Sequence, residues 1–190
     1  RYNIRLAEKK NLHVFWDSTE VGLEKFLSLL PRTNYRHRIK SHESRHYQSI
    51  LKAGQEHGTV QIAWAQDGKQ LLAANMCIFF GSTVTYLHGV SDYRFRHLMA
   101  PYLLQWEAIK KSYDLGFRYY DFGGLAPADH SRPSWEGFTT FKRGFRGQEI
   151  ASPGTFDFIY QRSAYDLYTQ MRSFNRSVRS TLRSITHLGK

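Results

Sequence analysis

The pattern of apolar and polar positions predicts three helical segments at the start of the chain. Residues 1–10 have the pattern of the end of a basic helix. Thr19 is a candidate N-cap of a second helix, which we expect to end at Pro31 because proline does not continue a helix. A basic loop (32–45) then leads to the third helix. The residues expected to face inward are Leu23, Phe26, Leu27 and Leu30 in the second helix and Tyr47, Ile50 and Leu51 in the third.

Strand patterns follow and predict a meander, in addition to a short strand at 12–16. In 60–64 the large apolar residues recur at every second position, and Asp67-Gly68 is typical of a tight hairpin turn. Residues 70–80 are apolar on both faces, as in a central strand, and a glycine-containing turn leads to a third strand at 83–90. We therefore expect an antiparallel sheet in the middle of the chain.

The second half of the chain alternates between helical and extended patterns. A helix is expected from about residue 96 to 115, and RYYDFGG (118–124) is expected to be a strand that ends in two glycines. After a further helix, FDFIY (156–160) predicts a last short strand, and 162–188 a long terminal helix. The expected inward residues are Met99, Tyr102, Leu103, Trp106, Ile109 and Tyr113, then Phe138, Phe141 and Phe145, and finally Leu167, Met171, Phe174, Val178, Leu182 and Ile185.

This order of elements favours an α+β fold. It predicts one mixed, mainly antiparallel sheet flanked by helices, with a long C-terminal helix. Acyltransferases of the GNAT type are built in this way, although topology alone does not establish a function.

Charge indicates a possible partner. Lys and Arg number 27 against 16 Asp and Glu, which gives a formal charge of +11 at pH 7. An excess of this size is typical of proteins that bind nucleic acid, an anionic membrane or a phosphorylated substrate. A basic protein without such a partner is the alternative, and charge alone does not separate the two.

Cysteine usage and hydropathy favour a reducing compartment. Cys77, the single cysteine, lies in an apolar run and is expected in the core. No apolar run approaches the roughly 20 residues of a membrane span, and no signal-peptide pattern is present. We therefore expect a cytoplasmic protein without a transmembrane segment. Since the chain begins at Arg1 and not at Met, we expect it to be a piece of a longer protein.

The common cofactor and metal sites are not predicted. A GNAT enzyme that uses acyl-CoA needs a glycine-rich turn before the helix at 96–115, where backbone N–H groups contact the diphosphate. Here VSDYRFRHLMAP (90–101) has no glycine, so an acyl-CoA cofactor is disfavoured, although Arg94, Arg96 and His97 could bind an anion. No histidine lies at metal-ligand spacing with a carboxylate, so we expect neither a metal nor a cofactor.

Lys142 is the strongest candidate for chemistry. It lies beside the aromatic face of its helix, so its stem is expected to cover aromatic surface while its ammonium reaches the rim of a site. There it could bind a phosphate or stabilise negative charge on a carbonyl oxygen. A solvated lysine is the alternative. Asp121 at the strand end could orient a substrate amine or cap the next turn, and the sequence leaves both open.

Several segments together resemble the Fem family of peptidoglycan-bridge aminoacyltransferases. They are RYNIRLAEKK, FRHLMAPYLLQWEAI, YYDFGG and GFTTFKRGF followed by PGTFDF. The resemblance implies transfer of an amino acid from aminoacyl-tRNA to the stem-peptide amine of a precursor of the lipid II or UDP-MurNAc-pentapeptide type, without metal or CoA. Such enzymes pair two GNAT-like domains. This chain resembles the second domain (1–160) and a basic closing helix (161–190) that would pack on a missing N-terminal domain.

The resemblance also implies roles for individual residues. Lys142 matches the lysine proposed to stabilise the oxyanion, with Phe141 as its packing neighbour beside the acceptor end of the tRNA. Arg96 and Tyr102 match positions that face the precursor. The substrate-binding residues expected on this basis are Phe141, Arg96, Tyr102, Tyr120 and Asp121, and the expected tRNA contacts are Lys142, Arg143 and Arg146.

Two other functions stay open at the level of sequence. One is an acyl-CoA-dependent acyltransferase of the GNAT type, and the other is an inactive half-domain that binds tRNA. In the Fem reading the protein would work in the cytoplasm, at the inner face of the membrane.

Overall fold

The computed structural model describes residues 1–37, 41–126 and 133–187. The chain forms two compact units, Arg1–Gly147 and Gln148–Lys190. The helices of the first unit are α1 (Tyr2–Lys9), α2 (Glu20–His37), α3 (Ser44–Gln55), the 3-10 helix η1 (Tyr93–Leu98), α4 (Ala100–Asp114) and α5 (Pro133–Arg143). The second unit contains α6 (Arg162–His187).

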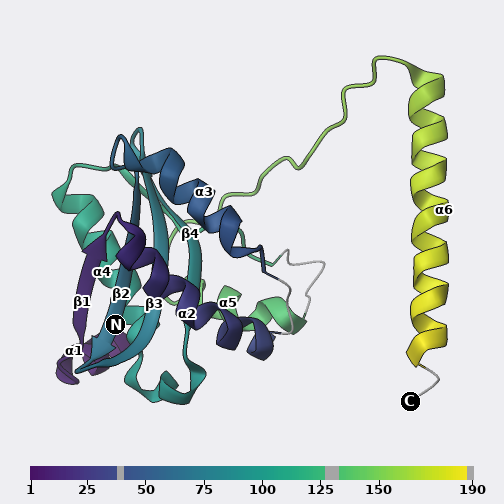
Figure 1. Cartoon of the computed structure of the whole chain (residues 1–190). Helices are drawn as coiled ribbons and strands as arrows, with labels where there is room; N and C mark the ends of the chain where they lie inside the picture. The colour runs from purple at the N-terminus through teal and green to yellow at the C-terminus, as the bar shows by residue number, and fades with distance from the viewer. Residues whose placement is uncertain (38–40, 127–132, 188–190) are drawn as a thin grey trace. The chain divides into compact units, whose positions relative to one another are not determined.

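The first unit is built on one five-stranded sheet in the order β1-β2-β3-β4-β5 (Figure 1). The strands are β1 (His13–Asp17), β2 (Val60–Asp67), β3 (Gln70–Phe80), β4 (Thr83–Ser91) and β5 (Tyr119–Asp121). All neighbours are antiparallel except β4 and β5, which are parallel. The predicted α+β fold with a mixed, mainly antiparallel sheet is therefore confirmed, as is the meander in its middle.

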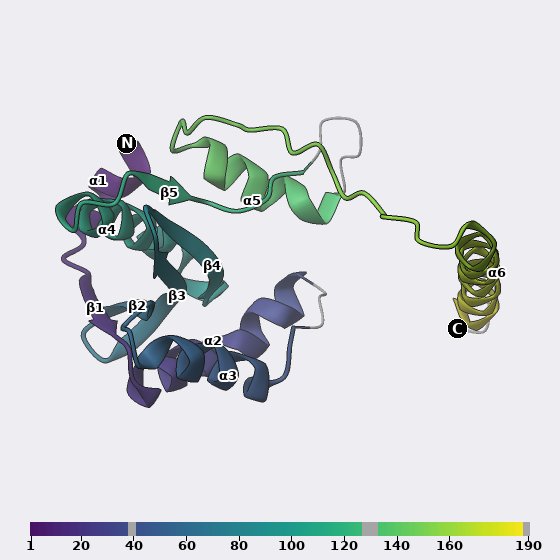
Figure 2. The same cartoon turned by 90° about the horizontal axis from the view of Figure 1, so that it is seen from above.

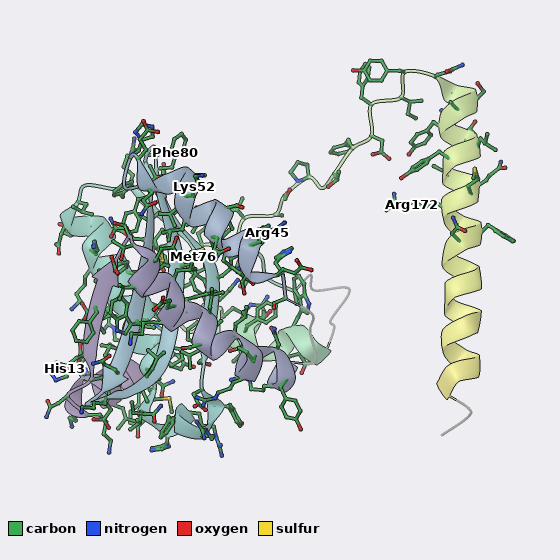
Figure 3. All side chains as sticks on the ribbon, in the orientation of Figure 1. His13, Arg45, Lys52, Met76, Phe80 and Arg172 are labelled. Atoms are coloured by element: carbon green, nitrogen blue, oxygen red, sulfur yellow. The ribbon has the colours of Figure 1, made fainter. Side chains whose placement is uncertain are left out.

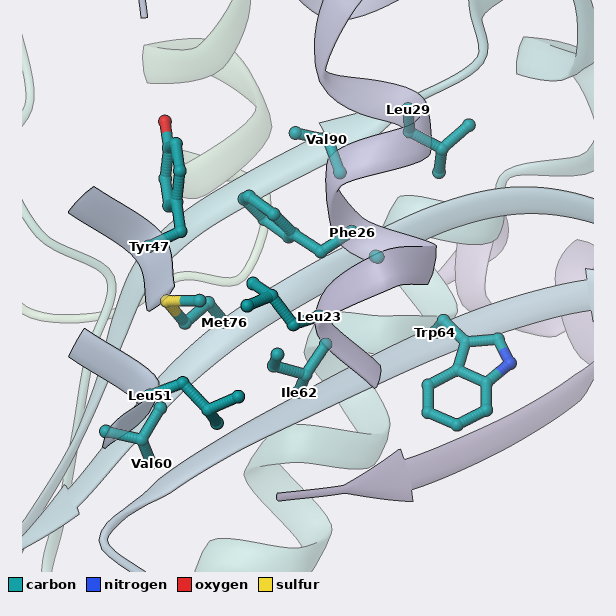
Figure 4. Close-up of a cluster of buried hydrophobic side chains, with 11 residues drawn as sticks. Leu23, Phe26, Leu29, Tyr47, Leu51, Val60, Ile62, Trp64, Met76 and Val90 are labelled. Atoms are coloured by element: carbon teal, nitrogen blue, oxygen red, sulfur yellow. The ribbon is translucent and has the colours of Figure 1, made fainter. Parts of the chain in front are cut away.

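Helices cover both faces of this sheet (Figure 2). The main core lies under α2 and α3, where Phe26, Leu51, Ile62 and Met76 are fully buried (Figure 4). On the other face α4 packs on β2 and β3. Because β3 is covered on both sides, it is apolar on both faces; Met76 in its middle is buried, whereas Phe80 at its end is 75% exposed (Figure 3).

The prediction that the second helix ends at Pro31 is wrong. The α2 helix continues through this residue to His37. The turn after Pro31 is held by tertiary contacts: Thr33 Oγ1 donates to the carbonyl of Ser91 (3.2 Å), and Arg32 pairs with Asp92 (2.6 Å). These contacts to the end of β4 offset the hydrogen bond that proline cannot make.

The predicted single helix over 96–115 is also partly wrong. Met99 has a φ of 55° and separates η1 from α4, so the helical face turns at this residue. Tyr113 is 82% exposed, whereas Leu104 and Gln105 are fully buried. The buried side chains of α4 are Ala100, Leu103, Leu104, Gln105, Ala108 and Ser112.

In the second unit, the predicted strand at 156–160 does not form, but the long helix does. Phe156, Phe158 and Tyr160 lie in irregular backbone and are 79%, 81% and 91% exposed. Leu167 and Phe174 of α6, expected to face inward, are exposed (60% and 70%). The side chains of Val178, Leu182 and Ile185 lie outside the described ones. Within the described segments, no helix combines the length and the apolar character that crossing a membrane requires.

Candidate active site around Lys142

Aromatic rings from three elements form one wall of the site. Phe141 on α5 lies edge-on to Tyr102 of α4, with 4.7 Å between ring centroids, and 5.5 Å from Phe145. Phe145 also contacts Phe122, which follows β5 (5.0 Å). Phe138 and Phe141 lie on α5 as predicted, but Phe145 follows the end of the helix at Arg143. The aromatic contacts of Phe141 and Phe145 fix the end of α5 beside α4 and β5.

Contacts with Gly124, Phe138 and Tyr86, beside this cluster of aromatic rings, hold the side chain of Lys142 in a defined place. Its ammonium donates a hydrogen bond to the carbonyl of Gly124 (2.8 Å), in the segment after β5. The same Nζ lies 5.4 Å from the ring centroid of Phe138 and 6.0 Å from that of Tyr86. The side chain is therefore partly buried, and aromatic faces favour its charged form.

Two opposing effects act on the charge of Lys142. Burial lowers the pKa of its ammonium, and the carboxylate of Asp121 works against this shift. Asp121 also accepts a hydrogen bond from the backbone N–H of Gly123 (2.7 Å), which is the turn-capping role that the sequence had left open. Asp121 therefore both shapes the turn after β5 and compensates the charge of Lys142.

A buried polar network lies under the site. Tyr120 donates to Oε1 of Gln105 (2.7 Å), and Gln105 is fully buried. Burial raises the pKa of Tyr86 and Tyr120, and raises that of Cys77 to about 12. All three groups are therefore neutral at physiological pH, and Cys77 is a core residue, as expected.

The geometry of β4 explains how Tyr86 reaches this network. The register between β3 and β4 shifts so that Cys77 pairs with Tyr86 but Met76 pairs with His88. This bulge directs Tyr86 toward α4, while His88 contacts Tyr47 on α3, on the opposite face of the sheet (ring centroids 5.2 Å apart). Gly89 is required here because a Cβ at this position would overlap the hydroxyl of Tyr86.

The other predicted site residues fall into two places. Asp121 acts on the charge of Lys142, Tyr102 packs on the adjacent Phe141, and Tyr120 contacts Phe122 after β5. Arg143 ends α5, and the exposed Arg146 follows it in a left-handed conformation (φ 58°). Arg96 instead lies over the ring of Tyr93, beyond the end of β4 (4.5 Å to the centroid), and shares no contact with Lys142 among the described ones.

Sequence reasoning missed Tyr86, Gln105 and Gly89. Only Gly89 carried a signal, since an isolated glycine in a strand often marks a bulge or a close approach. In contrast, nothing in the periodicity of 96–115 distinguishes Gln105 from a surface residue.

The turn after β4 does not fit the diphosphate of an acyl-CoA. The N–H groups of Arg94 and Phe95, at the start of η1, already donate to Asp92, to its Oδ1 (3.1 Å) and its carbonyl (3.1 Å). They are therefore not available to a phosphate, and bulky side chains replace the usual glycines. No group of three metal-ligating side chains that could hold an ion is found within 1–37, 41–126 and 133–187.

Comparison with known proteins gives consistent matches. The model of the FemAB family matches residues 52–173. A protein of Staphylococcus haemolyticus named lipid II:glycine glycyltransferase is 28% identical over 101 residues, which are 53% of this chain and 24% of that protein. The protein of the same name from Staphylococcus aureus matches equally (28%, 53% and 24%). The matched segment thus spans about a quarter of the length of these relatives.

Solved structures confirm the fold. The crystal structure of FemX superposes with a TM-score of 0.66 at 19% identity, covering 74% of this chain and 51% of that one. An aminoglycoside acetyltransferase from a soil metagenome, in complex with sisomicin, gives a TM-score of 0.55 at 13% identity, covering 80% and 99%. The first unit therefore has the fold of GNAT acetyltransferases.

Proposed function

The chain belongs to the FemAB family, and we propose that it is part of an enzyme that transfers an amino acid to the stem-peptide amine of a peptidoglycan precursor. The names of its relatives, lipid II:glycine glycyltransferases, support this class of acceptor. The observation that carries the proposal is the ammonium of Lys142, held against aromatic rings at the end of β5.

We further propose that the donor is an aminoacyl-tRNA. The formal charge of +11 favours a polyanionic partner, and phosphate contacts dominate binding of nucleic acid. Exposed basic side chains come from several elements, among them Arg45 and Lys52 on α3 and Arg172 on α6 (Figure 3). In the first unit, Arg143 and Arg146, which follow Lys142 in the chain, are also exposed.

The proposed chemistry is aminolysis of the donor ester. The acceptor nitrogen attacks the ester carbonyl, a C–N bond forms, and the C–O bond to the ribose of the tRNA breaks. The amine loses a proton and the ribose oxygen gains one. Lys142 donates one N–H to the carbonyl of Gly124, so two N–H groups remain for the oxyanion that develops on the ester carbonyl. Phe141 and Tyr102 would position the donor beside it, and Asp121 the amine.

The division of the chain is also a proposal. Residues 1–160 would act as the second GNAT-like domain, and the helix in 161–190 would pack on an N-terminal domain that this chain lacks. The relatives act, by their names, on lipid II, so we propose that the enzyme works at the cytoplasmic face of the membrane.

A transfer assay with the full-length parent protein tests the function. Labelled amino acid is supplied on tRNA, and its incorporation into a lipid II-type precursor is measured for the parent and for Lys142→Ala. We expect the variant to lose about 100- to 1,000-fold in rate, the usual effect of removing one oxyanion donor.

Lys111→Ala is the matched control. Lys111 on α4 also lies over an aromatic ring (4.3 Å from the centroid of Trp16), and burial also lowers its pKa, but it is not in the site. If both variants lose equally, or if Lys142→Ala keeps parental activity, Lys142 has no role in transfer. Stabilisation of the chain by acetyl-CoA in a thermal-shift titration would instead favour an acyl-CoA donor.

A further inference from the structure

The helix that carries Lys142 also carries a buried threonine to which the proposed chemistry gives no role. Thr139 is 5% exposed and precedes Lys142 by three positions, so the two side chains lie on the same face of α5. Among the side chains of α5 that the structure describes, Thr139 is the one buried polar group. Since a buried hydroxyl is costly without a hydrogen bond, its partner indicates its role.

The partner of Thr139 is the segment that follows β5. Oγ1 of Thr139 accepts a hydrogen bond from the backbone N–H of Ala126 (3.1 Å). Two residues earlier in the same segment, the carbonyl of Gly124 accepts a hydrogen bond from Nζ of Lys142 (2.8 Å). The segment 124–126 is therefore bound to α5 at two points. It runs antiparallel to the helix, because the later helix residue binds the earlier residue of the segment.

The carbonyl of Gly124 is fixed from the two residues that flank it. A Cβ at Gly124 would meet no described atom within 4 Å beyond its chain neighbours, so side-chain packing does not hold this residue. Before it, the N–H of Gly123 donates to Asp121, and after it the N–H of Ala126 donates to Thr139. A lysine stem is flexible, so its ammonium follows this carbonyl and does not fix it. Thr139 therefore helps to determine where the lysine ammonium lies.

We propose that Thr139 positions Lys142 for amino acid transfer, an inference that rests on the proposed function. By holding Ala126, it keeps the carbonyl of Gly124 where this oxygen binds one N–H of the ammonium, so that the other two are directed at the developing oxyanion. The carbonyl is neutral, so this contact leaves the full charge of the ammonium for the transition state. Thr139 acts only through the backbone and is a positioning residue.

Transfer kinetics of the full-length parent and its Thr139→Val variant test this role. Valine replaces the hydroxyl by a methyl group of similar size, so the hydrogen bond from Ala126 is lost and the carbonyl of Gly124 is held on one side only. Ala126 is half-buried, so water can bind its N–H and the fold persists. We expect kcat to fall about 10- to 100-fold and KM to stay within about threefold, because a displaced ammonium weakens an interaction made in the transition state.

Two further variants make the kinetic result specific. Thr139→Ser keeps the hydroxyl and should keep most of the parental kcat. Thr140→Val is the matched control, since it makes the same change at the next position of α5, where the side chain is exposed. We expect this control to transfer at the parental rate.

Chemical labelling of Lys142 provides a readout that does not require activity. Acetic anhydride acetylates only the neutral amine, so the pH dependence of labelling, followed by mass spectrometry of the 190-residue chain, reports the pKa of Lys142. A hydrogen bond from the ammonium to a carbonyl favours the charged form, and losing it lowers the pKa. The labelling curve of Thr139→Val should therefore lie at lower pH than that of the parent. The curves of Thr139→Ser and Thr140→Val should coincide with the parental curve.

The proposal is overturned if the labelling curve of Thr139→Val coincides with that of the parent, if its loss lies in KM alone, or if Thr140→Val is impaired equally. The two measurements also separate this proposal from the proposed function. A parent that transfers no amino acid while the labelling curve of Thr139→Val still shifts contradicts the function and leaves the positioning of the ammonium intact. A parent that transfers at the same rate as Thr139→Val supports the function and overturns the role of Thr139.

Discussion

At the scale of single residues, Lys142 combines a partly buried ammonium with a nearby carboxylate. Burial disfavours the protonated ammonium, whereas the carboxylate of Asp121 and the rings of Phe138 and Tyr86 favour it. The charge of Lys142 can therefore be tested through the pH dependence of the transfer rate.

On the alkaline side of its pH profile, we expect the transfer rate to fall at a pH below 10.5, which is the ordinary pKa of lysine. The pKa of Lys142 is lowered, and only its protonated form stabilises an oxyanion, so activity should fall as the pH rises through this lowered pKa. Lys142→Arg should keep its residual activity to higher pH, because a guanidinium stays charged. Hydrolysis of the charged tRNA without acceptor is measured in parallel and subtracted. An unchanged alkaline limb in the arginine variant would show that another group titrates.

The residues of this site differ in how far the sequence could predict them. Lys142 could be predicted from the sequence, because the phenylalanines around it recur at helical spacing. Tyr86 was not, since a regular strand would direct Tyr86 and His88 to the same face, and the bulge directs them to opposite faces. A register shift of one residue depends on pairing with β3, which local patterns do not contain.

At the scale of elements, the same contrast applies. The strands of the meander were predictable, because β3 is mostly apolar on both faces and a two-residue turn, Gly68-Lys69, joins Asp67 at the end of β2 to Gln70 at the start of β3. The end of α2 was not, because contacts of Thr33 and Arg32 with the end of β4 extend the helix beyond Pro31. The left-handed φ of Met99 is likewise not visible in the periodicity of 96–115. The alternating pattern at 156–160 does not say whether a neighbouring strand is present to pair with it.

Three histidines lie together: His88 on β4, His46 on α3, and His42 just before α3. The ring of His88 lies 6.4 Å from that of His42 and 6.3 Å from that of His46, and Tyr47 packs against it. Burial lowers the pKa of His88, and the two neighbouring imidazoles lower it further. The folded protein therefore takes up a proton here less readily than the unfolded chain does.

This difference predicts acid sensitivity. Between the lowered pKa of His88 and its ordinary value of 6.5, the unfolded state binds more protons, so stability rises with pH and is lost as the pH falls through this window. Urea denaturation at about pH 7.5 and 5.5 should show a smaller loss of stability for His88→Gln than for the parent. His57→Gln, in an exposed position after α3, is the control and should lose as much as the parent. Equal losses in all three proteins would contradict this assignment.

At the scale of the whole molecule, the buried apolar clusters belong to one unit. Every residue of the three clusters lies within Arg1–Gly147. In the second unit the described apolar side chains of α6 are exposed, including Leu167, Met171 and Phe174. An amphipathic helix with an exposed apolar stripe gains little stability from its own chain, which agrees with the proposal that it packs on another domain.

We therefore predict that residues 1–147 fold without the second unit. Removing 148–190 leaves all three apolar clusters complete, so the midpoint of thermal unfolding should change by less than about 3 °C, which corresponds to roughly 1 kcal/mol for a domain of this size. Circular dichroism at 222 nm follows the transition, with the full chain as reference. The matched control carries Leu51→Ala in the same truncated chain; deleting this fully buried side chain should cost about 2–5 kcal/mol and lower the midpoint clearly. If the truncation instead lowers the midpoint as much as Leu51→Ala does, residues 148–190 contribute to the stability of the first unit. That result would contradict the proposal that α6 packs on another domain.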